Sequence, residues 1–179
     1  MLFGETTTFA IEAMSEPGLV APSAVWGRLR IWCQGVALGD FSEAHCGLPS
    51  GQFDQLRSNI SSSWLEEFHG LTDEQLFDAL DRLLYGYSQG VEVADERANE
   101  QLRRDGDRYA RFEFLTNWGE MFDRAGKSFI FCPDGSTVKI LNGSDGSVPL
   151  RTLKTSVGCI QEACNGYAAW LEQETVRLK

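Results

Sequence analysis

The sequence predicts an α+β fold in which hairpins build an antiparallel sheet and helices pack mainly on one face of it. Three observations predict this class. Short runs with a period of two residues are separated by turns that contain glycine, and other runs have the helical period of 3.6. No strand–helix–strand repeat occurs. A chain of 179 residues can bury a real core, so we expect a single domain over residues 1–179.

The first predicted strand covers residues 9–14 and ends at the turn 15–18. Residues 25–41 follow, and their glycines, arginines and tryptophans raise the question of whether they form a chemical site or a hairpin. Apolar and long amphipathic side chains alternate here, which predicts a strand with one apolar face. The alternating residues are Leu29, Ile31 and Cys33 against Arg28, Arg30 and Trp32. No phosphate-binding loop fits, because nothing here follows a strand and opens a helix, so we interpret the stretch as a hairpin turning at Gln34-Gly35.

Helical periods of three and four residues appear in three places. Residues 53–68 predict an amphipathic helix that Gly70 ends, although the serines 61–63 lower its intrinsic propensity. Residues 73–85 predict a second helix, with a capping box from Thr72 to Gln75 and a stop at Gly86. A terminal helix is expected over residues 157–174.

The remaining segments complete the predicted order of elements. The polar residues 88–108 are expected to be partly helical, and alternation in residues 109–115 predicts a strand that leads to a turn presenting Trp118. Residues 128–141 form the clearest hairpin, around Pro133-Asp134-Gly135-Ser136. A further turn over residues 142–146 is expected to lead to a strand near 148–150.

Charge is the least ordinary property of the chain. The net charge is −10, and residues 40–81 contain nine acids against Arg57 alone. Such a segment repels nucleic acid and anionic membranes and attracts a basic partner. The basic run Arg97, Arg103, Arg104 and Arg108 is interleaved with acids, which argues against a phosphate-binding stripe. We therefore expect neither a nucleic-acid nor a membrane partner; a solvated acidic face without any partner is the simpler alternative.

Export and membrane signals are missing from the sequence. The first residues contain no basic segment, and no apolar run approaches the roughly 20 residues that span a bilayer. The five cysteines are an odd number without regular spacing, which favours reduced thiols over a disulfide framework. We expect a cytoplasmic protein.

Candidates for catalysis and metal binding are weak. Only His45 and His69 could serve as the base of a nucleophilic site, and no Gly-x-Ser-x-Gly motif occurs. His45-Cys46 is one adjacent pair of zinc ligand types, and a second pair is missing. Two carboxylates could meet in a cleft for hydrolysis, but the sequence singles out no pair. We therefore predict no catalytic, cofactor-binding or metal residues.

Binding remains as the chemistry that the residues favour. The candidates are the acids on and before the second predicted helix, together with aromatic side chains near turns, which often anchor interfaces. The predicted partner-binding residues are Glu66, Glu67, Asp73, Glu74, Asp78, Asp81, Tyr85, Tyr87 and Trp118. For each aromatic residue, packing at the edge of the core is the competing interpretation.

The first 45 residues resemble the immunity protein 42 family of bacterial polymorphic toxin systems. The matching features are Phe3-Gly4, Phe9-Ala10-Ile11-Glu12, Trp26-Gly27-Arg28, Trp32, the Gly35 turn and Leu38-Gly39-Asp40. A fainter similarity covers residues 141–171, and residues 45–110 have no match.

The resemblance implies an immunity protein that binds the C-terminal domain of a toxin and blocks it without catalysis. The motif residues then build the sheet, and none carries over as a partner contact. Because many such toxins are nucleases with basic active sites, we hypothesise that the acids of residues 66–81 face a basic toxin surface. The alternatives are an acidic interaction or scaffold domain with no toxin partner, and a small hydrolase with a raised carboxylate pKa in a cleft.

Overall fold

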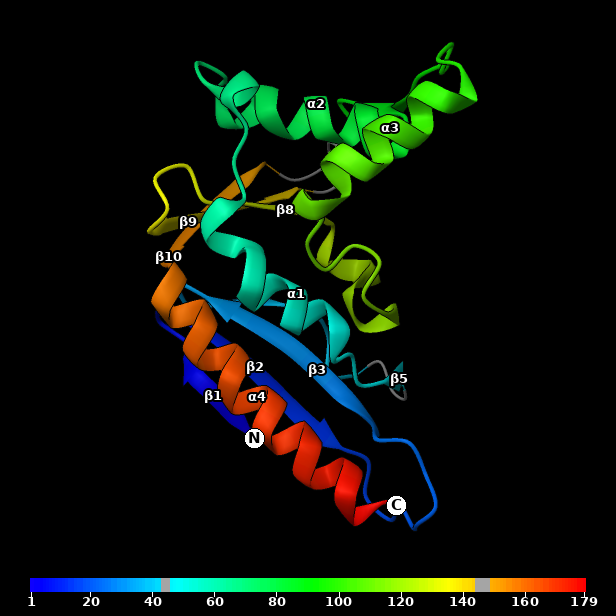
Figure 1. Ribbon diagram of the computed structural model, residues 1–179, viewed down its shortest axis with the longest axis vertical. Helices are drawn as coiled ribbons and strands as arrows, with labels where there is room; N and C mark the ends of the chain where they lie inside the picture. The colour runs from blue at the N-terminus through cyan, green and yellow to red at the C-terminus, as the bar shows by residue number, and fades with distance from the viewer. Residues whose placement is uncertain (43–45, 144–148) are drawn as a thin grey trace.

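The structure, a computed structural model, describes residues 1–42, 46–143 and 149–179 (Figure 1). The described part contains four α-helices, and its strands pair only in antiparallel fashion. The predicted α+β class is confirmed. The strands form a five-stranded, a three-stranded and a two-stranded sheet instead of one continuous sheet.

The five-stranded sheet has the order β1-β2-β3-β4, and β5 also pairs with β3. Its strands are β1 (Leu2–Glu5), β2 (Phe9–Ser15), β3 (Trp26–Cys33), β4 (Val36–Leu38) and β5 (Cys46–Gly47). The predicted hairpin of residues 25–41 is confirmed as β3 and β4. Both turn residues have positive φ, 51° at Gln34 and 77° at Gly35, and the Gly35 amide donates to Thr6 O at 2.7 Å. The sequence did not predict β1.

One face of this sheet is the floor of the main core. The inward residues Phe9, Ile11, Leu29 and Ile31 are fully buried, as the period of two requires. Helix α4 (Val157–Arg177) lies across β1 and β2 on this face, and α1 (Gly51–Asn59) packs beside it (Figure 1). The prediction of a terminal helix is thereby confirmed.

The three-stranded sheet has the order β10-β9-β8, and both of its faces are covered. Its strands are β8 (Lys127–Phe131), β9 (Thr137–Gly143) and β10 (Arg151–Ser156), so the hairpin predicted over residues 128–141 is confirmed. Phe129 and Phe131 enter one apolar cluster, while Ile130 and Val138 enter the main core on the other face. Most of the turn predicted over 142–146 lies outside the described residues, and the strand expected near 148–150 begins only at Arg151.

The helix predicted over residues 53–68 is wrong in its second half. Helix α1 ends at Asn59, and two short 3₁₀ turns follow, η1 (Ile60–Ser62) and η2 (Glu66–Phe68). The hydroxyls of Ser62 and Ser63 both donate to the Asn59 carbonyl, which is how serine side chains compete with helical hydrogen bonding. The serines therefore end the helix, where packing alone had been expected to sustain it.

The second predicted helix is confirmed, and the polar residues after it are partly helical as expected. Helix α2 (Asp73–Tyr85) is followed by a two-stranded hairpin of β6 (Tyr87–Ser88) and β7 (Val91–Glu92), and then by α3 (Asn99–Tyr109).

The strand predicted over residues 109–115 is wrong. Helix α3 continues into η3 (Ala110–Phe112), and only Glu113 forms an isolated bridge, with Phe129. Phe112 and Phe114 alternate because they enter different clusters. After these residues, η4 (Glu120–Ala125) leads into β8.

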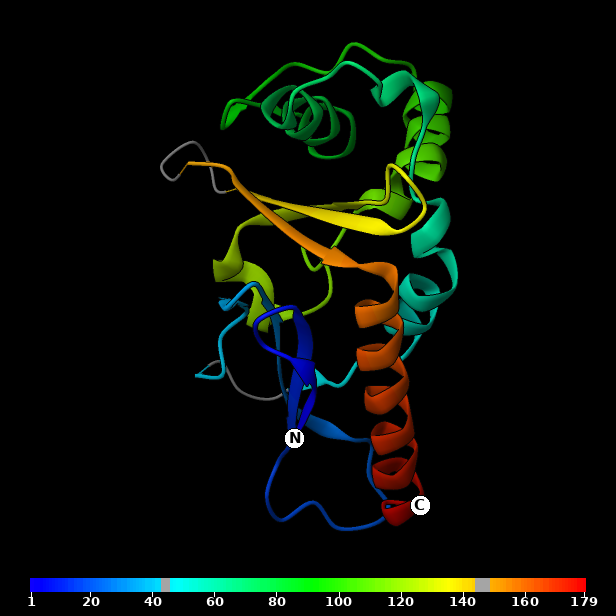
Figure 2. The ribbon, with the colours of Figure 1, turned by 90° about the vertical axis from the view of Figure 1, so that its left-hand side faces the viewer.

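Residues 64–112, from Trp64 through α2 and α3 to η3, form a helical lobe on the β8–β10 sheet. Figure 2 shows this lobe on one side of the sheet, with α4 and the five-stranded sheet on the other. Phe68, Leu76, Leu80 and Phe112 from the lobe pack on Phe129, Phe131 and Leu141 of the sheet. Among the described helices, none combines the length and apolar character that a membrane span needs.

Candidate partner-binding surface

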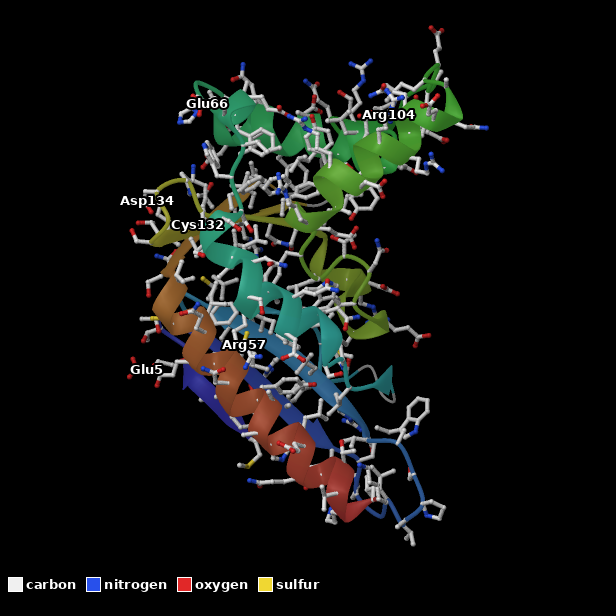
Figure 3. All side chains as sticks on the ribbon, in the orientation of Figure 1. Glu5, Arg57, Glu66, Arg104, Cys132 and Asp134 are labelled. Carbon is white, nitrogen blue, oxygen red and sulfur yellow. The ribbon has the colours of Figure 1, made fainter. Side chains whose placement is uncertain are left out.

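The helical lobe contains most of the residues that the sequence singles out for binding. Its residues 64–112 hold twelve acids and six arginines. Figure 3 shows the lobe's charged side chains at its surface, with Glu66 near one end and Arg104 near the other. Whether an acid here can meet a partner depends on what the chain itself places beside it.

The N-terminus of α2 is organised by the predicted capping box. The Thr72 hydroxyl accepts from the Gln75 amide at 3.3 Å, and the Gln75 side chain accepts from the Thr72 amide at 2.9 Å. Gly86 ends the helix with a φ of 73°, a conformation that costs glycine little. These two caps set where α2 begins and ends, and the buried Leu76 and Leu80 set which face packs inside.

Three of the six predicted acids are neutralised inside the chain. Glu67 accepts from Arg108 and from the Tyr109 hydroxyl, Asp73 pairs with Lys139 at 2.6 Å, and Asp81 pairs with Lys127 at 2.5 Å. The environments of Asp73 and Asp81 differ in kind.

Asp73 joins the start of α2 to the three-stranded sheet. Its second oxygen accepts from the Thr152 hydroxyl at 2.7 Å. Partial burial acts to raise the pKa of Asp73, but the Lys139 ion pair and the Thr152 hydrogen bond outweigh it and hold this pKa below its ordinary value. The carboxylate is therefore charged, and its charge is already compensated.

Asp81 lies inside the protein, with 4% of its surface exposed. Burial raises the pKa of its carboxyl, and the Lys127 ammonium opposes that effect. Such a residue stabilises the contact between α2 and β8, and it presents no atom that a partner could reach. We leave Asp81 out of the binding surface on this ground.

The other three predicted acids keep their negative charge uncompensated or nearly so. Glu74 is exposed and makes no hydrogen bond or ion pair with another described residue. Glu66 is 95% exposed at its side chain, and its one ion-pair contact among the described residues is with His69, at 3.4 Å. Asp78 accepts from the Ser88 hydroxyl and from the Gln89 amide, which are neutral donors that leave its charge in place.

Two further acids belong to this surface and were not singled out from the sequence. Glu92 and Glu96 are exposed and have no ion-pair partner among the described residues. The signal was present in the acids of residues 92–96, but these acids were interpreted only as an argument against nucleic-acid binding. The free acids therefore extend along α2 and the segment after β7.

A groove runs between the solvent side of α2 and residues 93–97, with a volume of about 900 Å³. Arg97 holds its outer wall: the guanidinium donates to Leu83 O at 3.1 Å, to Asp105 at 2.6 Å and to Asp95 at 2.5 Å. Ala79 and Gly86 lie along the groove and leave it room. Asp78, Asp95 and Glu96 line it together with Arg82 and Arg97, so the groove presents both carboxylates and guanidiniums.

The three predicted aromatic residues are not equivalent. Tyr87 is 36% exposed, and the Lys127 ammonium lies 4.1 Å from its ring centre. Tyr85 is half-buried and packs on Phe129, with ring centres 6.1 Å apart. Trp118 lies outside the lobe, at the edge of the main core.

Trp118 packs edge-to-face on Phe53 and Phe114, with ring centres 5.1 and 5.4 Å apart. The turn does not present its indole freely to solvent. The structure thus brings Tyr87 together with the acids of α2 and keeps Trp118 apart from them.

The described residues offer few groups for catalysis or metal binding. Within the described ranges, no group of three or more His, Cys, Asp or Glu side chains is placed to hold a metal ion. His45, half of the candidate zinc pair, lies outside the described residues. His69 has its ring nitrogen 3.0 Å from the Glu66 carbonyl oxygen at the end of η2 and makes no hydrogen bond to a cysteine or serine of the described residues.

Comparison with known proteins supplies the identity that the geometry alone does not. No curated protein matches the chain. The crystal structure of CdiI from Burkholderia dolosa AUO158 has the same fold, with a TM-score of 0.58 and 15% sequence identity over 95% of this chain and 99% of that chain. The family model described as immunity protein 42 matches residues 1–174. The chain belongs to the immunity protein 42 family.

Proposed function

We propose that this immunity protein neutralises a cognate toxin domain by binding it through the free acids of the helical lobe, and that the toxin is a basic nuclease. Inhibition is by occupation and not by catalysis. The observation that carries the proposal is a set of lobe carboxylates that pair with no lysine or arginine among the described residues: the exposed Glu66, Glu74, Glu92 and Glu96, and the half-buried Asp78.

Electrostatics supports a basic partner. Uncompensated charges on one end of a protein with net charge −10 create a field that speeds encounter with a positive surface. A nuclease is such a partner, because its active site must hold phosphate groups. Tyr87 beside these acids adds a partly exposed aromatic ring of the kind that anchors interfaces. The site of action would be the cytoplasm, where a nuclease finds its substrate.

The test is a charge reversal on the lobe with a matched reversal elsewhere. The lobe variant is Glu66→Lys, Glu74→Lys and Glu96→Lys. The control is Glu5→Lys, Glu162→Lys and Glu172→Lys, three exposed acids outside the lobe that change the net charge equally. Figure 3 places Glu5 far from Glu66. The binding partner is the toxin domain encoded beside the gene of this chain, and association is followed by stopped flow at low and moderate salt.

We expect the lobe variant to associate about 10-fold more slowly at low salt, with a shallower salt dependence, and the control to change by less than about 2-fold. Equal effects of the two variants would show that only net charge matters and would contradict the lobe as the binding surface. If the neighbouring gene encodes no toxin and no toxin binds, the chain acts as an acidic scaffold instead.

A further inference from the structure

The chain between β7 and α3 continues the β6–β7 hairpin and then loses its pairing partner. Beyond the paired residues Tyr87 and Glu92, the Val93 amide still donates to the Gly86 carbonyl at 2.8 Å. Pairing stops there because Gly86 caps α2, so the chain before it is helix and offers no strand to the residues after Val93. In Figure 2 this connection passes α2 on its way to α3 without forming a helical turn.

The residues that follow, Ala94, Asp95 and Glu96, have free backbone groups. All three are exposed, and none of their amides or carbonyls makes a hydrogen bond with another residue in the described ranges. Free N–H and C=O groups that prolong a strand are the groups to which an extended peptide adds as a further strand.

The free segment is held at both ends. Val93 is fixed by Gly86 at one end. At the other end, the Arg97 guanidinium donates to Leu83 O at 3.1 Å and to Asp105 at 2.6 Å. The Arg97 amide also donates to the Asp95 carboxylate, at 3.0 Å. The segment is therefore positioned before any partner arrives, which lowers the entropy cost of binding.

Open space lies on both sides of this segment. The groove of about 900 Å³ separates it from α2, and a second hollow of about 450 Å³ separates it from Leu102 and Gly106 of α3. A side chain at Gly106 would meet no atom within 4 Å, so α3 leaves this hollow open. Because side chains of a strand point alternately to opposite faces, an added strand needs room on both sides.

The charges of the groove favour a basic side chain in that strand. Its walls hold three acids and two arginines, but Asp95 and Arg97 pair with each other at 2.5 Å. Asp78 and Glu96 then remain, without a lysine or arginine partner in the part of the chain that the structure describes, against Arg82. One negative charge is therefore in excess.

We propose that the toxin domain inserts an extended segment with a lysine or arginine into this groove and pairs its backbone with residues 94–96. The inference rests on the proposed function and specifies how the partner binds, by strand addition as well as by charge. The free backbone groups select this occupant. A helix satisfies its own backbone groups and would leave those of residues 94–96 unpaired.

The experiment removes one backbone donor at a time. Proline has no amide hydrogen, and successive amides of an extended chain point to opposite sides, so one of Ala94→Pro and Asp95→Pro removes the donor that faces the groove. The matched controls Ala94→Val and Asp95→Ala keep the amide. Calorimetry measures the Kd of each for the toxin domain encoded beside the gene of this chain, and circular dichroism reports folding. Hydrogen exchange on the wild type, free and bound, follows residues 94–96 without any substitution.

We expect one proline variant to bind about 10-fold more weakly than its own control, because the partner's acceptor is left unpaired. In the wild-type complex, exchange of amides within residues 94–96 should slow by about 10-fold or more. That protection would support the proposal even if the proline variants failed to fold.

Two results would overturn the proposal. If the toxin domain binds, but both proline variants match their controls and residues 94–96 gain no protection, strand addition is wrong while the acidic surface still stands. If the toxin domain does not bind the wild type at all, the proposed function fails and the present inference fails with it.

Discussion

The ammonium nitrogen of Lys127 lies 2.5 Å from a carboxylate oxygen of Asp81, and this pair links α2 of the helical lobe to β8. Asp81 is buried, whereas Lys127 is 29% exposed at its side chain. The same ammonium lies over the ring of Tyr87, so one lysine connects the interior of the lobe with an aromatic residue on its surface.

The substitution Asp81→Ala should destabilise the protein by about 2 kcal/mol, because it removes the hydrogen-bonded ion pair with Lys127, whose partly exposed ammonium still reaches water. The free energy of unfolding in urea measures this. Glu74→Gln is the control, since Glu74 has no partner among the described residues, and it should leave stability within about 0.5 kcal/mol of the wild type. Equal stability of the two variants would contradict a structural role for Asp81.

The capping box of α2 predicts a smaller effect. Thr72→Ala removes the hydroxyl that accepts from the Gln75 amide and should cost about 1 kcal/mol of stability. Thr72→Ser keeps an acceptor at the same place and should restore most of it. Thermal unfolding followed by circular dichroism compares the two, and an alanine variant as stable as the serine variant would show that the cap does not matter.

Asp73 predicts a pH dependence. Its folded pKa is below the ordinary value of 3.8, so its stabilising effect is complete above that value and is lost as pH falls through the folded pKa. The wild type should therefore lose stability below about pH 4 more steeply than Asp73→Asn does. Urea unfolding at pH 5 and pH 3 tests this. Parallel pH profiles for the two proteins would contradict the Lys139 and Thr152 contacts as the cause.

Phe131 predicts a strong effect of packing under the lobe. Its ring stacks on Phe112, with centres 5.5 Å apart, and also contacts Phe68 and Trp64 edge-on. Phe131→Ala should cost about 3–5 kcal/mol, and Ile130→Val, on the opposite face of the same strand, about 0.5–1.5 kcal/mol. Hydrogen exchange should show residues 64–112 opening first in the alanine variant. Uniform opening of the whole chain would show instead that the lobe does not unfold by itself.

Elements with strong local chemistry could be predicted from the sequence. A few neighbouring residues determine the structure of three elements: the capping box at Thr72, the alternating strand β3 and the Pro133–Ser136 turn. Of the two wrong elements, the helix predicted over residues 53–68 ends early through local serine hydrogen bonds to Asn59, and the strand predicted over residues 109–115 fails because of distant contacts. The pattern at residues 109–115 is that of a strand, but Phe112 and Phe114 alternate because they pack into different clusters.

The acidic character of the lobe could be predicted from the sequence, but which of its acids are neutralised could not. A run of acids on α2 is visible in the sequence, but the pairing of Glu67 with Arg108, 41 residues away, is not. Neither is the pairing of Asp73 with Lys139. Such neutralisation depends on which cations the fold brings near, so the sequence overstated these acids and passed over Glu92 and Glu96.

The β8–β10 sheet lies between two apolar clusters. The residues that maintain the main core can therefore be conserved in evolution while those of the lobe change. Successive side chains of β8 pack on different neighbours: Ile130 packs in the main core, and Phe129 and Phe131 pack against the lobe. The lobe can then drift in sequence, or be exchanged as a block for that of a relative, while the remaining core stays intact. Under the proposed function, binding a different toxin would require substitutions within the about fifty residues of the lobe, while the main core stays unchanged.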